Sequence, residues 1–374
     1  MPQKNDHIPL KKPFLPPKRR SAVLYQRTED VDRPAGHASK NRTWIYVAVI
    51  GAAFSVGLFF IGRYTASRIS LIINAQPTAI YIMGDSLSDT GNYPLIVGPL
   101  SPPAQWNNHF SNGPMWPEYF SGFLGIPYSQ SNNVAVGGAC TFRHVLSPEI
   151  SIPGLIDQIS ELPLPTNMVA RSKALYIVWI GHNDLQAVFQ SEDPINTALY
   201  NEYSSQALSN IQYGLETLYS LGGRIFLVPN LGDMTQTPQY ISEFDASTLT
   251  VIRSEIQDYN SRLAKLLNNF ASCHHSCTIF RFDFFSLFDD IVQNHTSYSI
   301  PSGYGIGDTD SIFLQTYDWW IGENYVSWDG LHPTSKVHRI IADRLYDLTR
   351  TAQLRKSVSA QADKGPDHPV PALP

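Results

Sequence analysis

The chain has 374 residues, of which 43% are hydrophobic and 12% aromatic, and its formal net charge is −5. This composition is typical of a globular protein with a sizeable core and excludes a largely disordered chain. The charge is uneven, because residues 1–43 carry ten Lys and Arg against four Asp and Glu, which leaves −11 for the rest. An acidic body without a basic stripe argues against a nucleic-acid partner.

The first 62 residues divide into a polar tail and an apolar run. Residues 1–43 are rich in proline and charge and lack a periodic apolar pattern, so we expect them to be disordered. Residues 44–62 contain no charged residue and are long enough to cross a bilayer as one helix, whereas a signal peptide would have a shorter apolar core. The excess of Lys and Arg before this run predicts a cytoplasmic N-terminus. The rest of the chain is then expected outside the cytoplasm, in a periplasm, a lumen or the extracellular space.

Residues 75–352 alternate apolar runs with amphipathic segments, and residues 353–374 are predicted to form a second disordered tail. Apolar runs that begin near Ile80, Ala174 and Arg224 predict buried strands, and segments with helical spacing lie between and after them. Two of the helices are expected to start near Ser247 and Thr334. Continuous apolar strands separated by helices indicate an α/β fold with a mostly parallel sheet. Ligands of such sheets bind beyond the carboxyl ends of the strands.

Three cysteines are too few for a disulfide framework in a chain of this length. Cys273 and Cys277 lie in the sequence CHHSC, which suits a metal site, a local disulfide or two unrelated thiols. Zinc is disfavoured because no second ligand pair follows at the spacing of a zinc site. Outside the cytoplasm, a Cys273–Cys277 disulfide is the favoured alternative, with Cys140 left as a thiol.

The first apolar run stops abruptly at a glycine, an acid and Ser86. Such residues are common in turns, but a serine that follows a buried strand is also a candidate nucleophile. A serine hydroxyl needs a neighbouring base, and the base needs a third group to orient it. The sequence WDGLHPT, residues 328–334, supplies Asp329 and His332 on one short loop. An Asp-x-x-His pair also occurs by chance in turns and caps, so the pair alone is weak evidence.

The same reaction needs N–H donors for the oxyanion that forms on the attacked carbonyl. Candidates are the backbone N–H of Ser86, a glycine N–H from the sequence NNVAVGGA and the side-chain amide of Asn183. Each candidate also has a purely structural explanation. Gly137 and Gly138 suit a tight turn, and Asn183 suits a helix cap.

Four sequence blocks occur in a fixed order: GDSLSDTGN, NNVAVGGA, WIGHND and WDGLHPT. Together they resemble the four blocks of the GDSL, or SGNH, family of lipases and esterases, over nearly the whole span 80–350. The resemblance implies a three-layer αβα sandwich with a flavodoxin-like parallel sheet, and the apolar run 44–62 predicts one transmembrane helix before it. It also implies that Ser86 is the nucleophile, His332 the general base and acid, and Asp329 its orienting carboxylate.

The resemblance further implies an oxyanion hole made of the Ser86 N–H, the Gly138 N–H and the Asn183 amide. Gly137 is the alternative to Gly138. No metal ion or organic cofactor is implied, because the nucleophile, the base and the oxyanion donors are all protein groups.

Asp85, Asp89 and Asn92 are expected to support the nucleophile turn rather than take part in the chemistry. Ser88 stands where the Gly-x-Ser-x-Gly elbow of the α/β-hydrolases has its second glycine. The chain therefore resembles the GDSL class of serine hydrolases and not the α/β-hydrolase class.

Within the family, the chain resembles a bacterial group of phospholipases, lysophospholipases and glycerophospholipid:cholesterol acyltransferases. Members of that group often carry a cysteine pair before the Asp-x-x-His block, but residues 295–327 contain none, which leaves a regulatory disulfide loop in doubt. Residues 302–328 are instead dense in aromatic side chains, which either form an apolar wall for an acyl chain or pack against the core. These side chains are Tyr304, Phe313, Tyr317, Trp319, Trp320 and Tyr325.

Three functions remain open at this stage. The first is a membrane-anchored enzyme that cleaves acyl esters of phospholipids or lysophospholipids, with acyl transfer to an alcohol left open as a second activity. The second is an esterase of the same fold that removes acetyl groups from polysaccharide. The third is a catalytically silent binding module. A lipid ester and the membrane are the expected partners, and protein partners are unknown.

Overall fold

The computed structural model describes residues 76–98, 106–307 and 319–362. The expected tail and membrane span, residues 1–62, lie outside these ranges. Within them, no helix is both long and apolar enough to cross a bilayer. The last helix, α12 (Ser335–Ala362), continues past residue 352, where we expected the domain to end.

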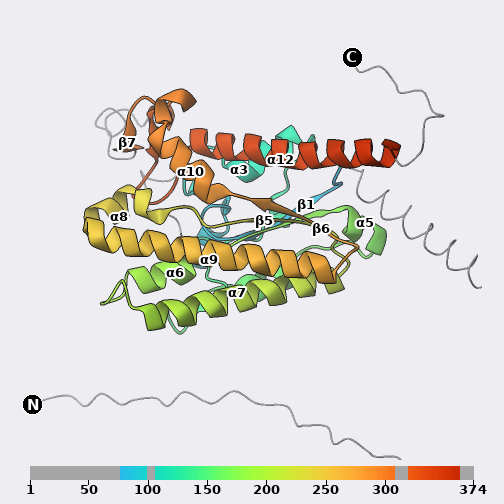
Figure 1. Cartoon of the computed structure of the whole chain (residues 1–374), viewed down its shortest axis with the longest axis horizontal. Helices are drawn as coiled ribbons and strands as arrows, with labels where there is room; N and C mark the ends of the chain where they lie inside the picture. Colours follow the sequence, from blue (N-terminus) through green and yellow to red (C-terminus); the bar gives the residue numbers. More distant parts are fainter. Residues whose placement is uncertain (1–75, 99–105, 308–318, 363–374) are drawn as a thin grey trace, which may run out of the picture. The chain divides into compact units, whose positions relative to one another are not determined.

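A parallel sheet with the strand order β1-β4-β5-β6 forms the centre of the fold (Figure 1). Its strands are β1 (Ile80–Gly84), β4 (Leu175–Trp179), β5 (Ile225–Pro229) and β6 (Thr278–Phe282). The segment 133–136 runs beside the free edge of β1, where the Val134 N–H donates to the Ile82 carbonyl and the Val136 N–H to the Gly84 carbonyl. The second sequence block therefore lies next to the strand that leads to Ser86.

Helices cover both faces of this sheet (Figure 1). One face carries α4 (Leu155–Glu161), α6 (His182–Phe189), α7 (Thr197–Ser220) and α9 (Ala246–Cys273), and the other carries α3 (Trp116–Phe123), α10 (Phe284–Gln293) and α12. Successive side chains of a strand point to opposite faces, so Met83 lies in one core and Ile82 in the other. Burial on both faces explains why the strands are uninterrupted apolar runs. The α/β fold with a parallel central sheet is the one predicted.

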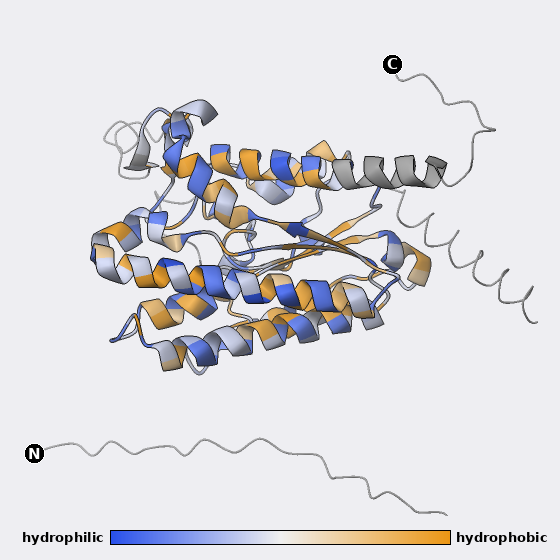
Figure 2. Ribbon diagram, in the orientation of Figure 1, coloured by the Kyte–Doolittle hydropathy of each residue, from blue (hydrophilic) through white to orange (hydrophobic). Residues whose placement is uncertain are grey.

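The helix α9 shows how the sequence pattern sets the packing. Its buried side chains recur every three or four residues, at Ile252, Ile256, Tyr259, Leu263, Leu267 and Phe270. Figure 2 shows apolar and polar positions alternating along this helix. Asp245 caps its first turn, because the carboxylate accepts the Thr248 N–H at 2.8 Å. The helix begins at Ala246, one position before the predicted start near Ser247.

Short elements connect these layers. The short helices are α2 (Tyr93–Ile96), α5 (Met168–Lys173) and α8 (Pro238–Glu243), and the 3₁₀ turns are Trp106–Asn108, Gln130–Asn132, Met234–Gln236, His295–Tyr298 and Trp319–Asn324. Two small ladders pair β2 (His144–Val145) with β3 (Ser151–Ile152) and β7 (Gly303–Ile306) with β8 (Tyr325–Ser327).

The expected Cys273–Cys277 disulfide is absent from the structure. Cys273 is the last residue of α9 and carries an exposed free thiol. Cys277 lies beyond the following turn and is packed, partly buried, against the core. The two side chains thus face different surroundings although only three residues separate them. Cys140 is a buried thiol.

Candidate active site

The turn that carries Ser86 begins where β1 ends. Gly84 is required there, because a Cβ at this position would lie 2.5 Å from the Trp179 carbonyl oxygen of β4. Gln158 fixes the same residue, since its side chain accepts the Gly84 N–H at 2.8 Å and donates to the Gly84 carbonyl at 2.9 Å. Ser86 is partly exposed between two buried neighbours. Its hydroxyl is therefore presented at the carboxyl end of the sheet.

His332 links Ser86 to Asp329. Its Nε2 lies 2.8 Å from the Ser86 Oγ, and its Nδ1 lies 2.7 Å from the Asp329 Oδ2. Because an ionised carboxylate only accepts hydrogen bonds, Nδ1 carries the ring hydrogen and Nε2 is the acceptor for the serine proton. The Asp329 Oδ1 accepts the backbone N–H groups of Leu331 at 2.8 Å and His332 at 2.7 Å. The same carboxylate thus orients the ring and shapes the loop that holds it.

At both His332 and Asp329, burial and neighbouring charge shift the pKa in opposite directions. Burial lowers the pKa of His332, but the charge and hydrogen bond of Asp329 outweigh it, and the pKa is raised from its ordinary value. Burial raises the pKa of the Asp329 carboxyl, but the His332 charge and the hydrogen bonds from the ring and backbone hold it below its usual value. The carboxylate is therefore ionised at neutral pH and stabilises the imidazolium form of the histidine.

Asp89 and Asn92 support the turn from beneath and do not line the pocket that contains Ser86. The Asp89 carboxylate accepts four backbone N–H groups at 2.6 to 2.9 Å, from Gly91, Asn92, Tyr93 and Gly137. The Asn92 amide donates to the carbonyls of Asn133 and Ala135, both at 2.8 Å. These bonds tie the turn after Ser86 to the segment beside β1.

The structure distinguishes the two candidate glycines. The Gly137 N–H donates to the buried Asp89 carboxylate at 2.8 Å, so that it is already engaged inside the protein. A Cβ at Gly137 would also lie 2.3 Å from the Phe110 ring. Gly138 follows with a φ of 73°, in the left-handed region that favours glycine. Gly138 is therefore the better candidate for a glycine oxyanion donor.

Asn183 reaches the site from the first turn of α6. Its side-chain amide donates to the Ala139 carbonyl at 2.9 Å, and the side chain lines the same pocket as Ser86. An amide has two N–H groups, so a second one remains for a ligand. The neighbouring Asp184 is buried and accepts the N–H and hydroxyl of Thr141 at 2.9 and 2.6 Å. These contacts hold the glycine segment against α6.

His182, which the sequence did not single out, connects two walls of the site. Its Nδ1 lies 3.3 Å from the Asp85 Oδ2, and its Nε2 accepts the Gly232 N–H at 3.1 Å. Because a backbone N–H only donates, Nδ1 carries the ring hydrogen and donates to Asp85. Asp85 in turn accepts the Leu87 N–H of the nucleophile turn at 3.0 Å. The one signal in the sequence was the position of His182 beside Asn183 in WIGHND.

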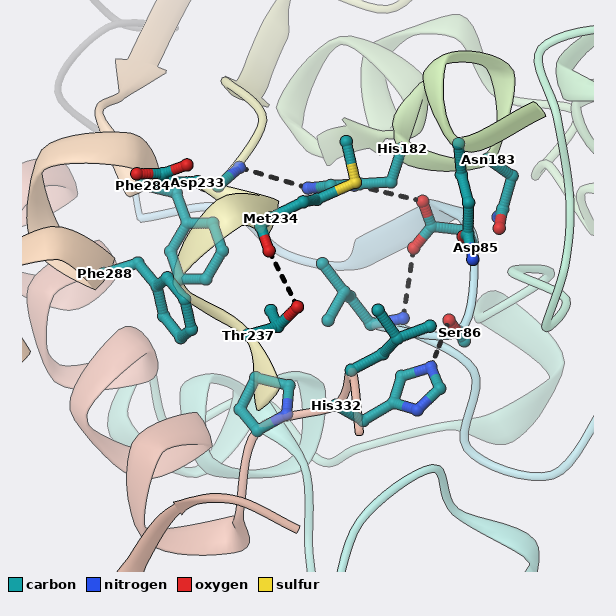
Figure 3. Close-up of a pocket in the computed structure, with 15 residues that line it drawn as sticks. Asp85, Ser86, His182, Asn183, Asp233, Met234, Thr237, Phe284, Phe288 and His332 are labelled. Carbon is teal, nitrogen blue, oxygen red and sulfur yellow. Dashed lines mark hydrogen bonds and ion pairs between the residues drawn. The ribbon is translucent and has the colours of Figure 1, made fainter. Parts of the chain in front are cut away.

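A pocket opens between the nucleophile turn and the loop after β5 (Figure 3). It has about 520 Å³ of space, including open solvent at its mouth. Figure 3 shows Ser86 and His332 at one end and Phe284 and Phe288 of α10 at the other. Met234 lies between these ends.

The aromatic segment that precedes the Asp-x-x-His block contributes no described side chain to this pocket. Trp319 packs against Trp328 with ring centroids 5.5 Å apart, and Trp320 is 79% exposed. Tyr304, Phe313 and Tyr317 lie outside the residues whose side chains are described. The aromatic rings that do line the pocket come from α10.

The arrangement suits nucleophilic attack by a serine on a carbonyl carbon. A base lies within hydrogen-bond distance of the hydroxyl, a carboxylate orients the base, and amide donors lie nearby. Among the described residues, no group of three or more His, Cys, Asp and Glu side chains is placed to hold a metal ion.

Known proteins share this sequence pattern. The GDSL-like lipase/acylhydrolase family matches residues 80–345. A GDSL esterase/lipase of Arabidopsis thaliana is 24% identical over 344 residues, which cover 72% of this chain and 87% of the relative. The thermolabile hemolysin of Vibrio parahaemolyticus is 24% identical over 288 residues, covering 73% of this chain and 64% of the hemolysin. An acetylesterase of Thermothelomyces thermophilus is 23% identical over 279 residues, covering 71% and 85%.

The solved structures that match this chain share a lower sequence identity with it. A variant of an acetyl xylan esterase from Geobacillus stearothermophilus is 13% identical and covers 74% of this chain and 96% of its own, with a TM-score of 0.39. The family match spans well over half of the sequence, from the first strand to α12. The chain therefore belongs to the GDSL-like lipase/acylhydrolase family and is a carboxylic ester hydrolase.

Proposed function

We propose that this chain hydrolyses acyl esters of lipids, in the manner of a phospholipase A or lysophospholipase, with Ser86, His332 and Asp329 as catalytic residues. The observation that carries the proposal is the continuous set of hydrogen bonds from the Ser86 hydroxyl through the His332 ring to the Asp329 carboxylate, beside a pocket with an apolar end. Asp85, Asp89 and Asn92 act as supports of the turn.

In the first half of the reaction, the Ser86 Oγ attacks the ester carbonyl carbon while the His332 Nε2 takes the hydroxyl proton. The N–H groups of Ser86 and Gly138 and the Asn183 amide donate to the oxyanion. The tetrahedral intermediate then collapses, and the bond between the carbonyl carbon and the alcohol oxygen breaks. His332 gives its proton to the departing alcohol oxygen, which leaves an acyl group on Ser86.

In the second half, water attacks the acyl group while His332 takes a proton from it. The tetrahedral intermediate releases the fatty acid, and His332 returns the proton to Ser86. An alcohol in place of water completes the same cycle as an acyl transfer, which we include as a secondary activity because the resemblance to bacterial acyltransferases suggests it.

Two observations support a lipid substrate. The far end of the pocket is made of buried phenylalanines, Phe284 and Phe288, which suit a hydrocarbon chain better than a sugar. One relative, 24% identical, is a hemolysin, a protein named for lysing blood cells.

The proposal for where the enzyme works in the cell rests on its N-terminal sequence alone. We propose that residues 44–62 anchor the chain in a membrane, because this run is uncharged and follows a segment rich in Lys and Arg. The catalytic domain then works outside the cytoplasm, at the bilayer surface.

The main alternative is the removal of acetyl groups from polysaccharide. It is favoured by the acetylesterase of Thermothelomyces thermophilus, which is 23% identical to this chain. A silent binding module is a weaker alternative, because every position that the chemistry needs is occupied.

A substrate panel separates these functions. The full-length chain in detergent micelles is assayed on a lysophospholipid, a diacyl phospholipid and an acetylated xylan, each beside the Ser86→Ala variant. Fatty-acid release that disappears in Ser86→Ala is the expected result. Acetate release alone would favour the polysaccharide function, and silence on all three substrates would favour the binding module.

A further inference from the structure

We propose that the end of the pocket formed by α10 is the acyl-chain subsite, and that the Phe288 ring sets the longest acyl chain the enzyme accepts. This inference rests on the proposed ester hydrolysis. It adds which part of the ester enters the pocket and which side chain limits it.

The apolar character of this end favours a hydrocarbon chain. Phe284 and Phe288 are only 3% and 4% exposed, and Leu87, Met234 and Leu331 also line the pocket. A chain of methylene groups placed among these side chains leaves water, and each methylene adds favourable free energy. A sugar hydroxyl in the same place would lose its hydrogen bonds to water without replacement.

The charges around the pocket argue against a phosphate head group in it. The side chains that line it include the carboxyl groups of Asp85 and Asp233, and none of the lining residues is Lys or Arg. Asp233 is fully buried and pairs with Arg253, which does not line the pocket. An anionic head group would therefore find no cationic side chain among the lining residues to pair with, and it stays in the solvent while the uncharged acyl chain enters.

The loop after β5 packs against α10, where a Cβ at Gly232 would lie 2.6 Å from the Phe284 ring, and this loop is held in place from several sides. The Asn260 side chain accepts the Leu231 N–H at 3.0 Å and donates to the Leu231 carbonyl at 2.9 Å. The next residue, Gly232, donates to His182 at 3.1 Å. A loop fixed by these bonds cannot move away from α10 to admit a longer acyl chain, so the size of the α10 side chains sets the room at this end of the pocket.

Phe284 and Phe288 belong to the same core, but Phe284 also contacts the central sheet through Trp179, so Phe288 is the side chain to change. The Phe284 ring contacts Trp179 edge to face with ring centroids 4.8 Å apart, and it packs against Phe288 at 5.5 Å. The two phenylalanines are four residues apart and share one face of α10. Replacing Phe288 therefore opens the pocket and leaves the contact between Phe284 and Trp179 in place.

The same helix offers a matched control. Phe285 is also buried, at 9% exposure, but it packs in the core on the other face of the sheet and lies under the Arg253 guanidinium at 5.0 Å. It does not line the pocket. Phe285→Ala therefore removes the same number of atoms from the same helix without changing the proposed subsite.

The test measures kcat/KM of the full-length chain on two ester series. In the first, the acyl group grows from acetyl to dodecanoyl with p-nitrophenol as the constant alcohol. In the second, the alcohol grows and the acyl group stays butanoyl. For Phe288→Ala we expect kcat/KM on long acyl chains to rise about fourfold for each methylene newly buried, with the alcohol series unchanged. Phe288→Trp is expected to shift the optimum to shorter acyl chains, and Phe285→Ala to keep the wild-type profile.

A Phe288→Ala profile that matches the wild type, or a shift in the alcohol series instead of the acyl series, would overturn the subsite while leaving ester hydrolysis intact. Equal turnover by the wild type and Ser86→Ala, or no turnover of any ester, would instead overturn the proposed function and the subsite with it. If Phe288→Ala does not fold, Phe288→Leu makes a smaller opening on the same helix, and the same shift is expected with a lower amplitude.

Discussion

The Asp89 Oδ2 accepts the Gly137 N–H at 2.8 Å across 48 residues of sequence. This bond joins the turn that carries Ser86 to the glycine segment that runs beside β1. It also engages the Gly137 N–H, which leaves the neighbouring Gly138 as the proposed glycine donor to a substrate. The spacing between the proposed nucleophile and the proposed oxyanion donors therefore depends on a carboxylate that does not touch the substrate.

Asp89→Asn is expected to reduce both stability and activity. The amide nitrogen of the new side chain would face backbone N–H groups, and each buried donor left without an acceptor costs about 1 to 3 kcal/mol. We expect a loss of about 2 to 6 kcal/mol in the free energy of unfolding for two such donors, measured by urea titration, and a clear fall in kcat. Ser86→Ala is the control that loses activity at unchanged stability. A wild-type midpoint and kcat in Asp89→Asn would contradict this role.

Two substitutions of His182 separate its two hydrogen bonds. Asn reaches the position of Nδ1 and keeps a donor for Asp85, whereas Gln reaches the position of Nε2 and keeps an acceptor for Gly232. We expect His182→Asn mainly to raise KM, because the pocket wall loosens, and His182→Gln mainly to lower kcat, because the nucleophile turn loses its support. His182→Leu should lose about 5- to 30-fold in kcat/KM, from two bonds of about 1 kcal/mol each. Three variants with the same KM and kcat would refute the positioning role.

The pH profile reports the protonation of His332. The reaction needs the neutral ring, and Asp329 raises the pKa of this histidine, so kcat/KM should rise with pH through a value above the ordinary histidine pKa of about 6.5. In Asp329→Asn the carboxylate charge that raises the His332 pKa is gone, while burial still lowers this pKa. The rise of kcat/KM with pH should therefore move to lower pH. The rate should also fall on the order of 10³- to 10⁴-fold. An acid limb that does not move between the two proteins would argue against the pairing.

His338 should make the fold sensitive to acid. It is completely buried in α12, and neither ring nitrogen has a hydrogen-bond partner within the described part of the chain. Burial first, then His332 and His109, lower its pKa to about 3, against about 6.5 in the unfolded chain. The unfolded state therefore binds the proton more readily, and stability is lost as the pH falls below about 6.5, by about 2 kcal/mol between pH 7 and pH 5.

The variant His338→Leu tests this contribution. Leucine has no ionisable group, so this part of the loss of unfolding free energy between pH 7 and pH 5 should disappear, as measured by urea titration at each pH. Stability at pH 7 should be retained or increased, because two buried nitrogens without partners are removed. A pH dependence identical to that of the wild type would show that another group controls acid stability.

The sequence alone predicted the parts of the site that lie where strands end. The parallel sheet follows from apolar runs separated by helices, and such a sheet brings the carboxyl ends of β1 and β4 together. Ser86 and Asn183 each follow one of these strands, so both lie at the same edge of the sheet. Asp329 and His332 could be paired because they share one loop, and the structure has both in contact with each other and the ring in contact with Ser86.

Other parts of the site depend on contacts that no local pattern reveals. Gly138 is favoured over Gly137 because the Asp89 carboxylate, 48 residues away in the sequence, already accepts the Gly137 N–H. The position of His182 between Asp85 and Gly232 depends on how three loops meet. The apolar end of the pocket comes from α10, whose phenylalanines look in the sequence like ordinary core residues, whereas the aromatic-rich segment near Trp320 drew attention by its composition.

The central claim is that the Ser86 hydroxyl, activated by His332, attacks the ester. The most direct measurement is mass spectrometry of the full-length chain after treatment with a fluorophosphonate, followed by peptide mapping of the adduct. The account predicts one adduct on Ser86, loss of lysophospholipid hydrolysis in step with labelling, and greatly slowed labelling in His332→Ala. Undiminished hydrolysis in a chain fully labelled at Ser86, or in Ser86→Ala, would contradict it.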